Sequence, residues 1–311
     1  MFLKLTIYLI ESFIYIISLP LIPFISKKKD KHQTKRIKFI DFYRDFDKKN
    51  NYYTNLLKRF NYKFEIVETN PDILIYNISG ITQFIPDTIL KFKYNNCKLI
   101  YTTSEYESFN KKSLCRFADL NLTFQYTDKY NNIRLPFWVI LNVKDLKLRR
   151  NNFSKFCCFV YSNPIKHREN FCKKLSEYKK VDCGGRSLNN LGYRVKDKIK
   201  FQKNYKFCIA YENNSQNGYT TEKILDAFLS GCLPIYYGNP NIYTDFNKGT
   251  FINANDFKNE DELINYIIKV DNDEELYNSY FNKQVISNKW LSILNDPEEK
   301  YFKLIADKII N

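Results

Sequence analysis

The sequence predicts an α/β fold in two units, each built around its own parallel sheet, with a helical C-terminal tail. At 311 residues the chain is long for one hydrophobic core, so two domains are expected. Hydrophobic residues make up 44% of it, which is enough to fill both cores. Short apolar runs rich in β-branched and aromatic residues alternate with polar, helix-like stretches, as strands and helices alternate in parallel α/β folds.

The predicted strands fall into two series. The first series comprises RIKFIDF (36–42), DILIYNI (72–78) and CKLIYTT (97–103). The second comprises KFCCFVYSNP (155–164), YKKVDCGGRS (178–187), YKFCIAYENN (205–214), LPIYYG (233–238) and GTFINA (249–254). We place the boundary between the two units near Leu148 to Asn152. Helices are predicted in the tail because three stretches there have acidic first turns: EDELINYIIKV (260–270), DEELYNSYF (273–281) and PEEKYFKLIADKII (297–310).

The N-terminus differs from the rest of the chain. Residues 2–25 are apolar and long enough to cross a bilayer, although Lys4 and Glu11 interrupt them. No small-residue cleavage site follows, so a signal peptide is not predicted. The basic tract KKKDKHQTKR (27–36) comes next, and positive charge tends to stay on the cytoplasmic side. We therefore expect residues 2–35 to associate with a membrane surface and the folded part to face the cytosol; the alternative is a buried N-terminal helix.

Charge and cysteine usage argue against a nucleic-acid partner and against a zinc site. The formal net charge is +15, which would suit a polyanion. The basic residues are scattered, however, and apart from the tract after residue 26 they form no stripe interleaved with aromatics, so nucleic acid is not a predicted partner. The eight cysteines show no CxxC pair and no zinc spacing. Buried, reduced thiols are predicted, with a disulfide framework as the alternative.

The strongest functional signal is YENNSQNGYTTEKILDAFLSGCLPIYYGNP (211–240). It predicts a strand end, a polar turn and a helix, with Thr220 or Thr221 as the N-cap and Gly231 as the stop. Four apolar residues of this helix are predicted to face the sheet: Ile224, Leu225, Phe228 and Leu229.

Lys223 lies in the first turn of that helix, where a cation opposes the helix dipole. A helix N-terminus at the carboxyl end of a strand is an anion site, and Lys223 strengthens it, so a diphosphate is the predicted ligand. Glu222 would accept hydrogen bonds from sugar or ribose hydroxyls; the alternative is an ordinary acidic first-turn residue. The same rule about strand ends points to Glu105–Glu107 and Gly184–Arg186.

These residues closely resemble the signature of the α1,3/α1,4-fucosyltransferases of glycosyltransferase family 10, in which F-E-N-S/T-Q-x-x-x-Y-x-T-E-K precedes P-I-Y-W/Y-G. With VYSNP, VDCGGR, LGYRVK and DFKNEDELINYI, the resemblance covers most of residues 155–290, and it is weaker over 95–140. The chain departs from the pattern in having Tyr211 for Phe and an extra Asn before Ser215.

The resemblance implies a GT-B architecture, two Rossmann-like domains facing a cleft. It implies inverting transfer of L-fucose from GDP-fucose to a glycan acceptor, α1,3 to N-acetylglucosamine or glucose. The chain would then divide into a membrane-associating segment (1–35), an acceptor-side domain (36–150), a GDP-fucose-binding domain (151–290) and a C-terminal helix (291–311).

The resemblance also implies roles for the donor site. Lys223 and Arg186 would bind the diphosphate and Glu222 the hydroxyls of the donor sugar. Tyr219 and Asn213 would line the donor pocket.

A catalytic base is expected in the first domain, because the acceptor hydroxyl must lose a proton as it attacks. The family carries this base in a Y-T-G-E-like turn, which matches IYTTSE here with Ser104 in place of Gly. Glu105 is the predicted base, and Glu107 is the alternative.

Two short acidic motifs, DFD (45–47) and DND (271–273), match the D-x-D of metal-dependent glycosyltransferases. So short a pattern is weak, and both are predicted to be solvated surface. No metal or other cofactor is expected, because Lys223 and Arg186 can neutralise a leaving diphosphate.

Two alternatives to fucosyl transfer remain. One is a GT-B glycosyltransferase that uses another nucleotide sugar or acceptor, since a fold does not determine a substrate. The other is a non-catalytic basic protein that binds a membrane surface.

Overall fold

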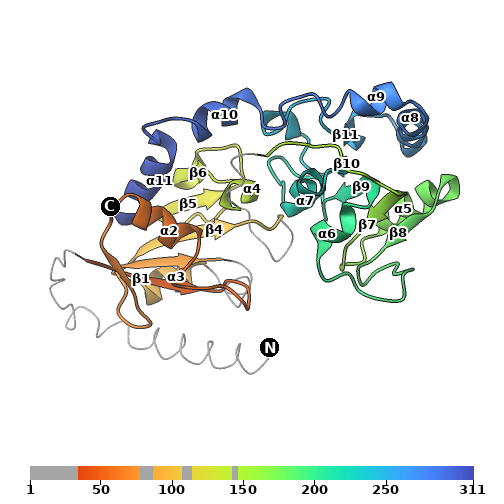
Figure 1. Cartoon of the computed structure of the whole chain (residues 1–311). Coiled ribbons are helices and arrows are strands. Elements are labelled where there is room, and N and C mark those ends of the chain that lie inside the picture. The colour runs from red at the N-terminus through yellow and green to blue at the C-terminus, as the bar shows by residue number, and fades with distance from the viewer. Residues whose placement is uncertain (1–33, 78–86, 107–113, 142–145) are drawn as a thin grey trace. The chain divides into compact units, whose positions relative to one another are not determined.

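The computed structural model in Figure 1 describes residues 34–77, 87–106, 114–141 and 146–311. The chain forms two compact units, one from the chain up to Leu135 together with Glu298–Asn311, and the other from Pro136–Pro297. The segment predicted to meet a membrane, residues 2–35, lies almost wholly outside the described residues. Within the described ranges, no helix is long and apolar enough to cross a bilayer.

The first unit contains a six-stranded parallel sheet in the order β2-β1-β3-β4-β5-β6. Its strands are β1 (Lys35–Ile40), β2 (Phe64–Ile66), β3 (Ile73–Tyr76), β4 (Lys98–Thr103), β5 (Leu120–Thr123) and β6 (Asn132–Arg134). The three predicted strands are confirmed as β1, β3 and β4. The other three, FEI, LNLT and NIR, do not stand out in the sequence because polar residues interrupt each of them, so none forms a continuous apolar run.

Helices α2 (Tyr52–Arg59) and α3 (Asp87–Lys93) and the 3-10 turn η3 (Lys129–Asn131) complete the connections of this unit. Helix α2 begins with a capping box: the Asn51 side chain accepts from Thr54 N–H at 3.1 Å, and the Thr54 hydroxyl accepts from Asn51 N–H at 3.0 Å. Its Tyr53 is buried, and the Tyr53 and Thr102 hydroxyls are 2.5 Å apart. This hydrogen bond ties α2 to β4.

The last helix, α11 (Lys300–Ile310), belongs to the first unit. Figure 1 shows it (blue) beside α2 (orange). The Arg59 guanidinium lies over the Phe302 ring at 5.5 Å and pairs with Glu299, and Tyr62 donates to Asp307. The chain therefore returns to its first unit at its end, instead of closing with a separate helical segment from residue 291 as the sequence predicts.

The second unit contains a five-stranded parallel sheet in the order β11-β10-β9-β7-β8. Its strands are β7 (Lys155–Phe159), β8 (Val181–Cys183), β9 (Tyr205–Tyr211), β10 (Leu233–Tyr237) and β11 (Ile252–Asn253). Its helices are α4 (Phe137–Ile140), α5 (Lys166–Tyr178), α6 (Lys198–Gln202), α7 (Glu222–Ser230), η4 (Ile242–Thr244), η5 (Ala254–Asp256), α8 (Glu260–Asn272), α9 (Glu274–Asn278) and α10 (Asn288–Leu294). All five predicted strands of this series are confirmed.

The boundary between the units comes earlier than predicted, at Pro136 rather than near Leu148 to Asn152. Trp138 on α4 explains the difference. It is buried, and its ring lies 5.2 Å from that of Phe246 and 5.1 Å from that of Trp290, both in the second unit. A contact with residues more than 100 positions away cannot be read from local periodicity.

Seven of the eight cysteines are buried, which confirms the predicted burial, and all eight are unpaired in the structure. Cys158, Cys208 and Cys232 pack together with Tyr205 under the second sheet. Burial raises the pKa of the Cys158 thiol well above its usual value, which keeps that thiol protonated.

The order of the second sheet positions the site. Strand β8 lies on one side of β7 and β9 on the other, so the chain reverses direction across the sheet between β7 and β9. Ligands of open parallel sheets bind at such a switch point, at the carboxyl ends of the strands. All seven residues of β9 are buried, and the chain leaves the sheet at Glu212.

Gly185, after β8, has no room for a side chain, because an added Cβ would lie 1.6 Å from the Tyr161 carbonyl oxygen. We expect Gly185→Ala to lower the free energy of unfolding by about 3 kcal/mol, as overpacking does. Gly192→Ala is the control: Gly192 has a φ of +76° but nothing within 4 Å of its Cβ position, so only about 1 kcal/mol of backbone strain is expected. Urea unfolding measures both, and equal losses would contradict the prediction.

Candidate functional site

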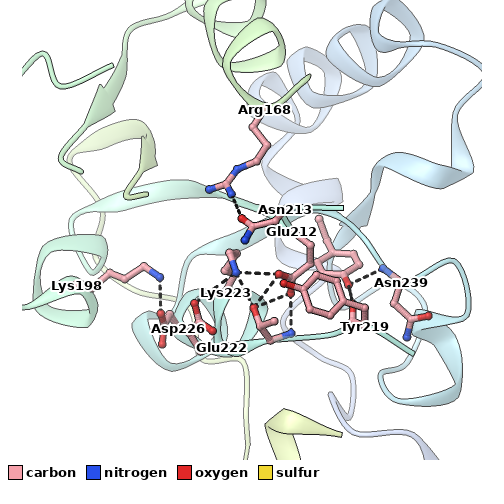
Figure 2. Close-up of polar contacts among 11 residues, drawn as sticks. Arg168, Lys198, Glu212, Asn213, Tyr219, Glu222, Lys223, Asp226 and Asn239 are labelled. Atoms are coloured by element: carbon pink, nitrogen blue, oxygen red, sulfur yellow. Dashed lines mark hydrogen bonds and ion pairs between the residues drawn. The ribbon is translucent and has the colours of Figure 1, made fainter. Parts of the chain in front are cut away.

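Glu212 is the centre of the site, at the carboxyl end of β9 (Figure 2). Its carboxylate is fully buried and accepts from Thr221 N–H at 2.7 Å and from the Thr221 hydroxyl at 2.8 Å. It also accepts from Lys223 Nζ at 2.9 Å. A buried carboxylate is costly unless it is paired and hydrogen-bonded, and here both conditions are met.

This carboxylate explains why a lysine is tolerated at the N-terminus of α7. Lys223 Nζ lies 2.9 Å from Glu212 and 3.5 Å from Glu222, and it donates to the Thr221 hydroxyl at 2.8 Å. Burial lowers the pKa of Lys223, but the two carboxylates outweigh it and raise that pKa above its usual value. The ammonium is therefore charged, is held in place, and keeps 17% of its side-chain surface exposed.

Thr221 occupies the N-cap position of α7, as predicted, but its side chain makes no capping hydrogen bond. The hydroxyl donates to Glu212 instead, so the first-turn N–H groups keep their attraction for an external anion. Gly231 ends the helix as predicted, with a φ of 77°. The predicted burial of Leu229 is wrong: Leu229 is 44% exposed, and the smaller Ala227 faces the core instead.

Arg168 is a site residue that the sequence analysis missed. It lies in the first turn of α5, is 1% exposed, and donates from Nη1 to Asn213 Oδ1 (Figure 2). Its guanidinium lies over the rings of Phe159 at 5.4 Å and Tyr161 at 4.7 Å. Its Nε is buried with no hydrogen-bond partner in the described structure. An arginine remains charged when buried, so a donor is left for an anionic ligand.

A signal for Arg168 exists in the sequence. It lies in the first turn of α5, the helix that follows β7. The carboxyl end of β7 belongs to the same sheet as that of β9. What the sequence does not show is that this turn reaches the loop after β9, where Asn213 lies. Arg168 and Lys223 are close enough that the arginine lowers the pKa of the lysine, against the larger effect of Glu212.

Arg186, the predicted second diphosphate ligand, is exposed after β8, and its Nε donates to the Ser162 carbonyl at 3.1 Å. Its role stays a prediction. Asn213 is half-buried and oriented by Arg168, as described above.

Tyr219 is buried at the base of the loop that enters α7. Its carbonyl accepts from the Tyr236 hydroxyl at 3.4 Å. The buried Asn239 fixes the same loop, since its Oδ1 accepts from Gly218 N–H at 2.7 Å and its Nδ2 donates to the Thr220 hydroxyl at 3.2 Å. The loop that presents Asn213 and Lys223 is thus rigidly held.

Glu222 offers hydrogen-bond acceptors at the rim of the site, with 42% of its side-chain surface exposed. Burial raises its pKa, but Lys223 and Lys198 outweigh this and lower it below the usual value, so the carboxylate is ionised. Lys198 is itself fixed by Asp226, 2.6 Å away. The exposed, ionised carboxylate suits hydroxyl groups of a sugar or ribose.

In the first unit, Glu105 follows β4 as predicted and is half-buried. Its N–H donates to the Thr103 hydroxyl at 3.0 Å, which closes the turn at the strand end. The alternative base, Glu107, lies outside the described residues.

The two acidic motifs differ in their surroundings. Asp45 and Asp47 are exposed, as predicted. The prediction of a solvated DND is wrong for Asp271, whose side chain is 6% exposed and pairs with Lys179 at 2.6 Å and Lys206 at 3.2 Å. Across the described ranges, no group of three or more His, Cys, Asp or Glu side chains could hold a metal ion.

Comparison with known families agrees with the site. Residues 151–294 match the model of the C-terminal part of glycosyltransferase family 10 (fucosyltransferase), and residues 37–141 match the N-terminal domain of alpha-(1,3)-fucosyltransferase FucT. Together the two matches cover both units.

Individual relatives show the same similarity. The chain is 47% identical over 113 residues to alpha-(1,3)-fucosyltransferase FucT of Helicobacter pylori, over 36% of this chain and 24% of that protein. It is 32% identical over 197 residues to human GDP-fucose protein O-fucosyltransferase 3, over 57% of this chain and 40% of that protein. The chain thus spans less than half the length of these relatives.

A crystal structure of an alpha1,3-fucosyltransferase with GDP-fucose matches with a TM-score of 0.66 and 25% identity, over 83% of this chain and 85% of that one. With two units built on parallel sheets, this likeness confirms the predicted GT-B fold class. The chain therefore belongs to glycosyltransferase family 10, the fucosyltransferases.

Proposed function

We propose that the protein transfers L-fucose from GDP-fucose to a hydroxyl of a glycan acceptor, with inversion at the anomeric carbon and an α1,3 linkage to N-acetylglucosamine or glucose. The observation that carries this proposal is a pair of cations, the buried Arg168 in the first turn of α5 and the partly buried Lys223 in the first turn of α7. Two carboxylates, Glu212 and Glu222, lie beside Lys223, whereas the buried Nε of Arg168 has no hydrogen-bond partner among the described residues. The similar alpha1,3-fucosyltransferase whose crystal structure contains GDP-fucose supports the choice of donor.

The donor diphosphate lies at the N-terminus of α7 in this proposal. Lys223 and the free Nε–H of Arg168 contact its oxygens, and the first-turn N–H groups contribute their dipoles. Arg186 extends toward the same ligand from the loop after β8, and Glu222 accepts from donor hydroxyls. As the bond from the anomeric carbon to the GDP oxygen breaks, the electron pair leaves with GDP, and the two cations stabilise that charge. No metal ion is needed for this step.

The acceptor step uses Glu105. The acceptor oxygen forms a bond to the anomeric carbon on the face opposite GDP, and its proton passes to the Glu105 carboxylate. Attack opposite the leaving group inverts the anomeric centre. The half-buried position after β4 gives the carboxylate a fixed backbone and access to a substrate.

A second acceptor class has a specific observation in its favour, because one relative is a GDP-fucose protein O-fucosyltransferase. The same donor chemistry would then serve a protein hydroxyl. An acceptor panel containing both N-acetyllactosamine-type glycans and a folded glycoprotein domain separates the two.

We also propose that residues 2–35 bring the enzyme to a membrane surface with its catalytic units in the cytosol. The apolar run and the following basic tract support this. Co-sedimentation with liposomes containing anionic lipid compares the full chain with a chain that starts near residue 36. Equal solubility of the two would contradict the proposal.

The function is tested by incubating the protein with GDP-fucose and EDTA and measuring GDP release with and without acceptor. Acceptor-stimulated release supports fucosyl transfer without a metal. If nucleotide were released only from another nucleotide sugar, a different glycosyltransferase would be favoured. If no donor gave any release, a non-catalytic membrane binder would be favoured.

Glu105→Gln removes the proposed base and retains the shape of the side chain. We expect kcat to fall about 100-fold to 10,000-fold, the usual contribution of a general base, while GDP-fucose binding is unchanged. Calorimetric titration and steady-state transfer assays measure the two quantities. Glu65→Gln on β2, an exposed carboxylate of the same unit, is the control. Transfer at the wild-type rate by Glu105→Gln would assign the base to another group.

Lys223→Met should weaken GDP-fucose binding by about 100-fold, as loss of a buried charge contact does. It also strands the Glu212 carboxylate, so the free energy of unfolding should fall by about 3 kcal/mol. The double variant Glu212→Gln, Lys223→Met removes both charges. It should recover most of the stability but none of the donor affinity.

Lys174→Met is the matched control for this pair, since Lys174 forms a surface ion pair with Asp261 and should change neither quantity measurably. Recovery of donor affinity in the double variant would show that Lys223 acts only through Glu212.

A further inference from the structure

The loop after β1, residues 41–46, presents an unusual amount of aromatic surface. Tyr43 is 63% exposed, the most of any large hydrophobic side chain in the described structure, and Phe42 and Phe46 are half-buried. The loop leaves the strand through Asp41, whose φ of 59° turns the chain away from the sheet. Aspartate is among the few residues that adopt this left-handed conformation readily.

These rings form a supported stack. Phe42 lies against Phe46 with ring centres 4.0 Å apart and planes within 19°, and Tyr43 meets Phe46 edge-on at 5.6 Å. Below them, the buried Phe39 of β1 lies 5.6 Å from Phe42 and 5.3 Å from Phe46. Tyr53 of α2 lies 6.2 Å from Phe42. The exposed ring of Tyr43 is therefore positioned by packed rings and not by a free loop.

The stack is connected to the turn that carries Glu105. Strands β1, β3 and β4 are parallel, and Ile40, Tyr76 and Tyr101 are at the same level, so the loops that follow β1 and β4 leave the same edge of the sheet. Tyr53 also links the two: its ring packs against Phe42, and its hydroxyl is hydrogen-bonded to Thr102, three residues before Glu105.

The charges of the loop discriminate among ligands. Over residues 41–49 three aspartates, Asp41, Asp45 and Asp47, are balanced by Arg44 and the two lysines at 48 and 49, so the segment has no net charge and offers no excess positive charge to an anionic ligand. Arg44 and Asp45 are exposed, and neither has a hydrogen-bond or ion-pair partner among the residues that the structure describes. They supply a donor and an acceptor beside an aromatic face, the combination that suits a neutral sugar, which has one apolar ring face and several hydroxyls.

We propose that Tyr43, backed by Phe42 and Phe46, is the surface on which a neutral pyranose ring of the acceptor glycan lies, with Arg44 and Asp45 at its hydroxyls. The inference rests on the proposed function, because it takes Glu105 as the base that the acceptor must reach. It adds that acceptor recognition depends on the loop after β1, in the unit that carries the base.

The test uses the full chain and measures the acceptor KM and kcat with saturating GDP-fucose, using neutral N-acetyllactosamine. Tyr43→Ala should raise the acceptor KM about 3- to 10-fold, the range for loss of one aromatic contact, and change kcat little. GDP-fucose affinity and acceptor-independent GDP release should be unchanged. Tyr43→Phe and Tyr43→Trp keep a ring and should stay within about 2-fold of the wild-type KM.

Tyr130→Ala is the matched control. Tyr130 is 47% exposed in the same unit but precedes β6, an edge strand that β3, β4 and β5 separate from β1. An unchanged KM in Tyr43→Ala would overturn the inference, as would an equal rise in Tyr130→Ala.

Direct binding separates this inference from the proposed function. Saturation-transfer NMR follows N-acetyllactosamine on the wild-type protein and on Tyr43→Ala. If no donor is ever used but glycan binding is lost in Tyr43→Ala, the proposed function fails and the sugar site stands. If transfer proceeds and binding is the same in both proteins, the sugar site fails and the proposed function stands.

Discussion

The carboxylate of Glu212 is buried at the end of the central strand of the second unit, and its hydrogen-bond partners come from the start of the helix that follows. It receives the Thr221 N–H, the Thr221 hydroxyl and the Lys223 ammonium. An ionised group without such partners would be expelled from the core or protonated. Because its partners all come from the N-terminus of α7, the carboxylate fixes that helix end against β9. The position of Lys223 at this helix end follows from this one constraint.

The same edge of the sheet contains one cation that is not fully satisfied. Arg168 is buried against two aromatic rings and bonded to Asn213, yet its Nε has no partner in the described structure. A fold that optimised stability alone would not leave such a donor unpaired. We interpret it as preorganisation: the desolvation cost is met in the free protein, so that a diphosphate finds its donor already in place. The Glu212 carboxylate is thus hydrogen-bonded within the protein, whereas Arg168 keeps one donor for a ligand.

The two units carry different chemistry because their strand ends carry different residues. The second sheet ends in cations and a rigid loop fixed by Asn239, which suits a charged donor. The first ends in Glu105 and an aromatic loop without excess positive charge, which suits the neutral acceptor and the proton transfer that we propose. Parallel sheets collect all their carboxyl ends at one edge, so a few residues after each strand are enough to build either kind of site.

The amino-acid sequence by itself determined the strands β1, β3, β4 and β7–β11, the stop at Gly231 and the choice of Lys223 and Glu222 as site residues, because each rests on local periodicity, a helix end or a contiguous signature. Only the tertiary structure decided what lies far apart in the chain. It brought Glu212 to Lys223, joined Arg168 to Asn213, placed Trp138 in the second unit and returned α11 to the first. It also paired Asp271 with the buried Lys206 and the exposed Lys179, which no short motif could reveal. The reason is physical: hydrophobic spacing along a chain reports which face of an element is buried, whereas the pairing of buried charges depends on which elements meet.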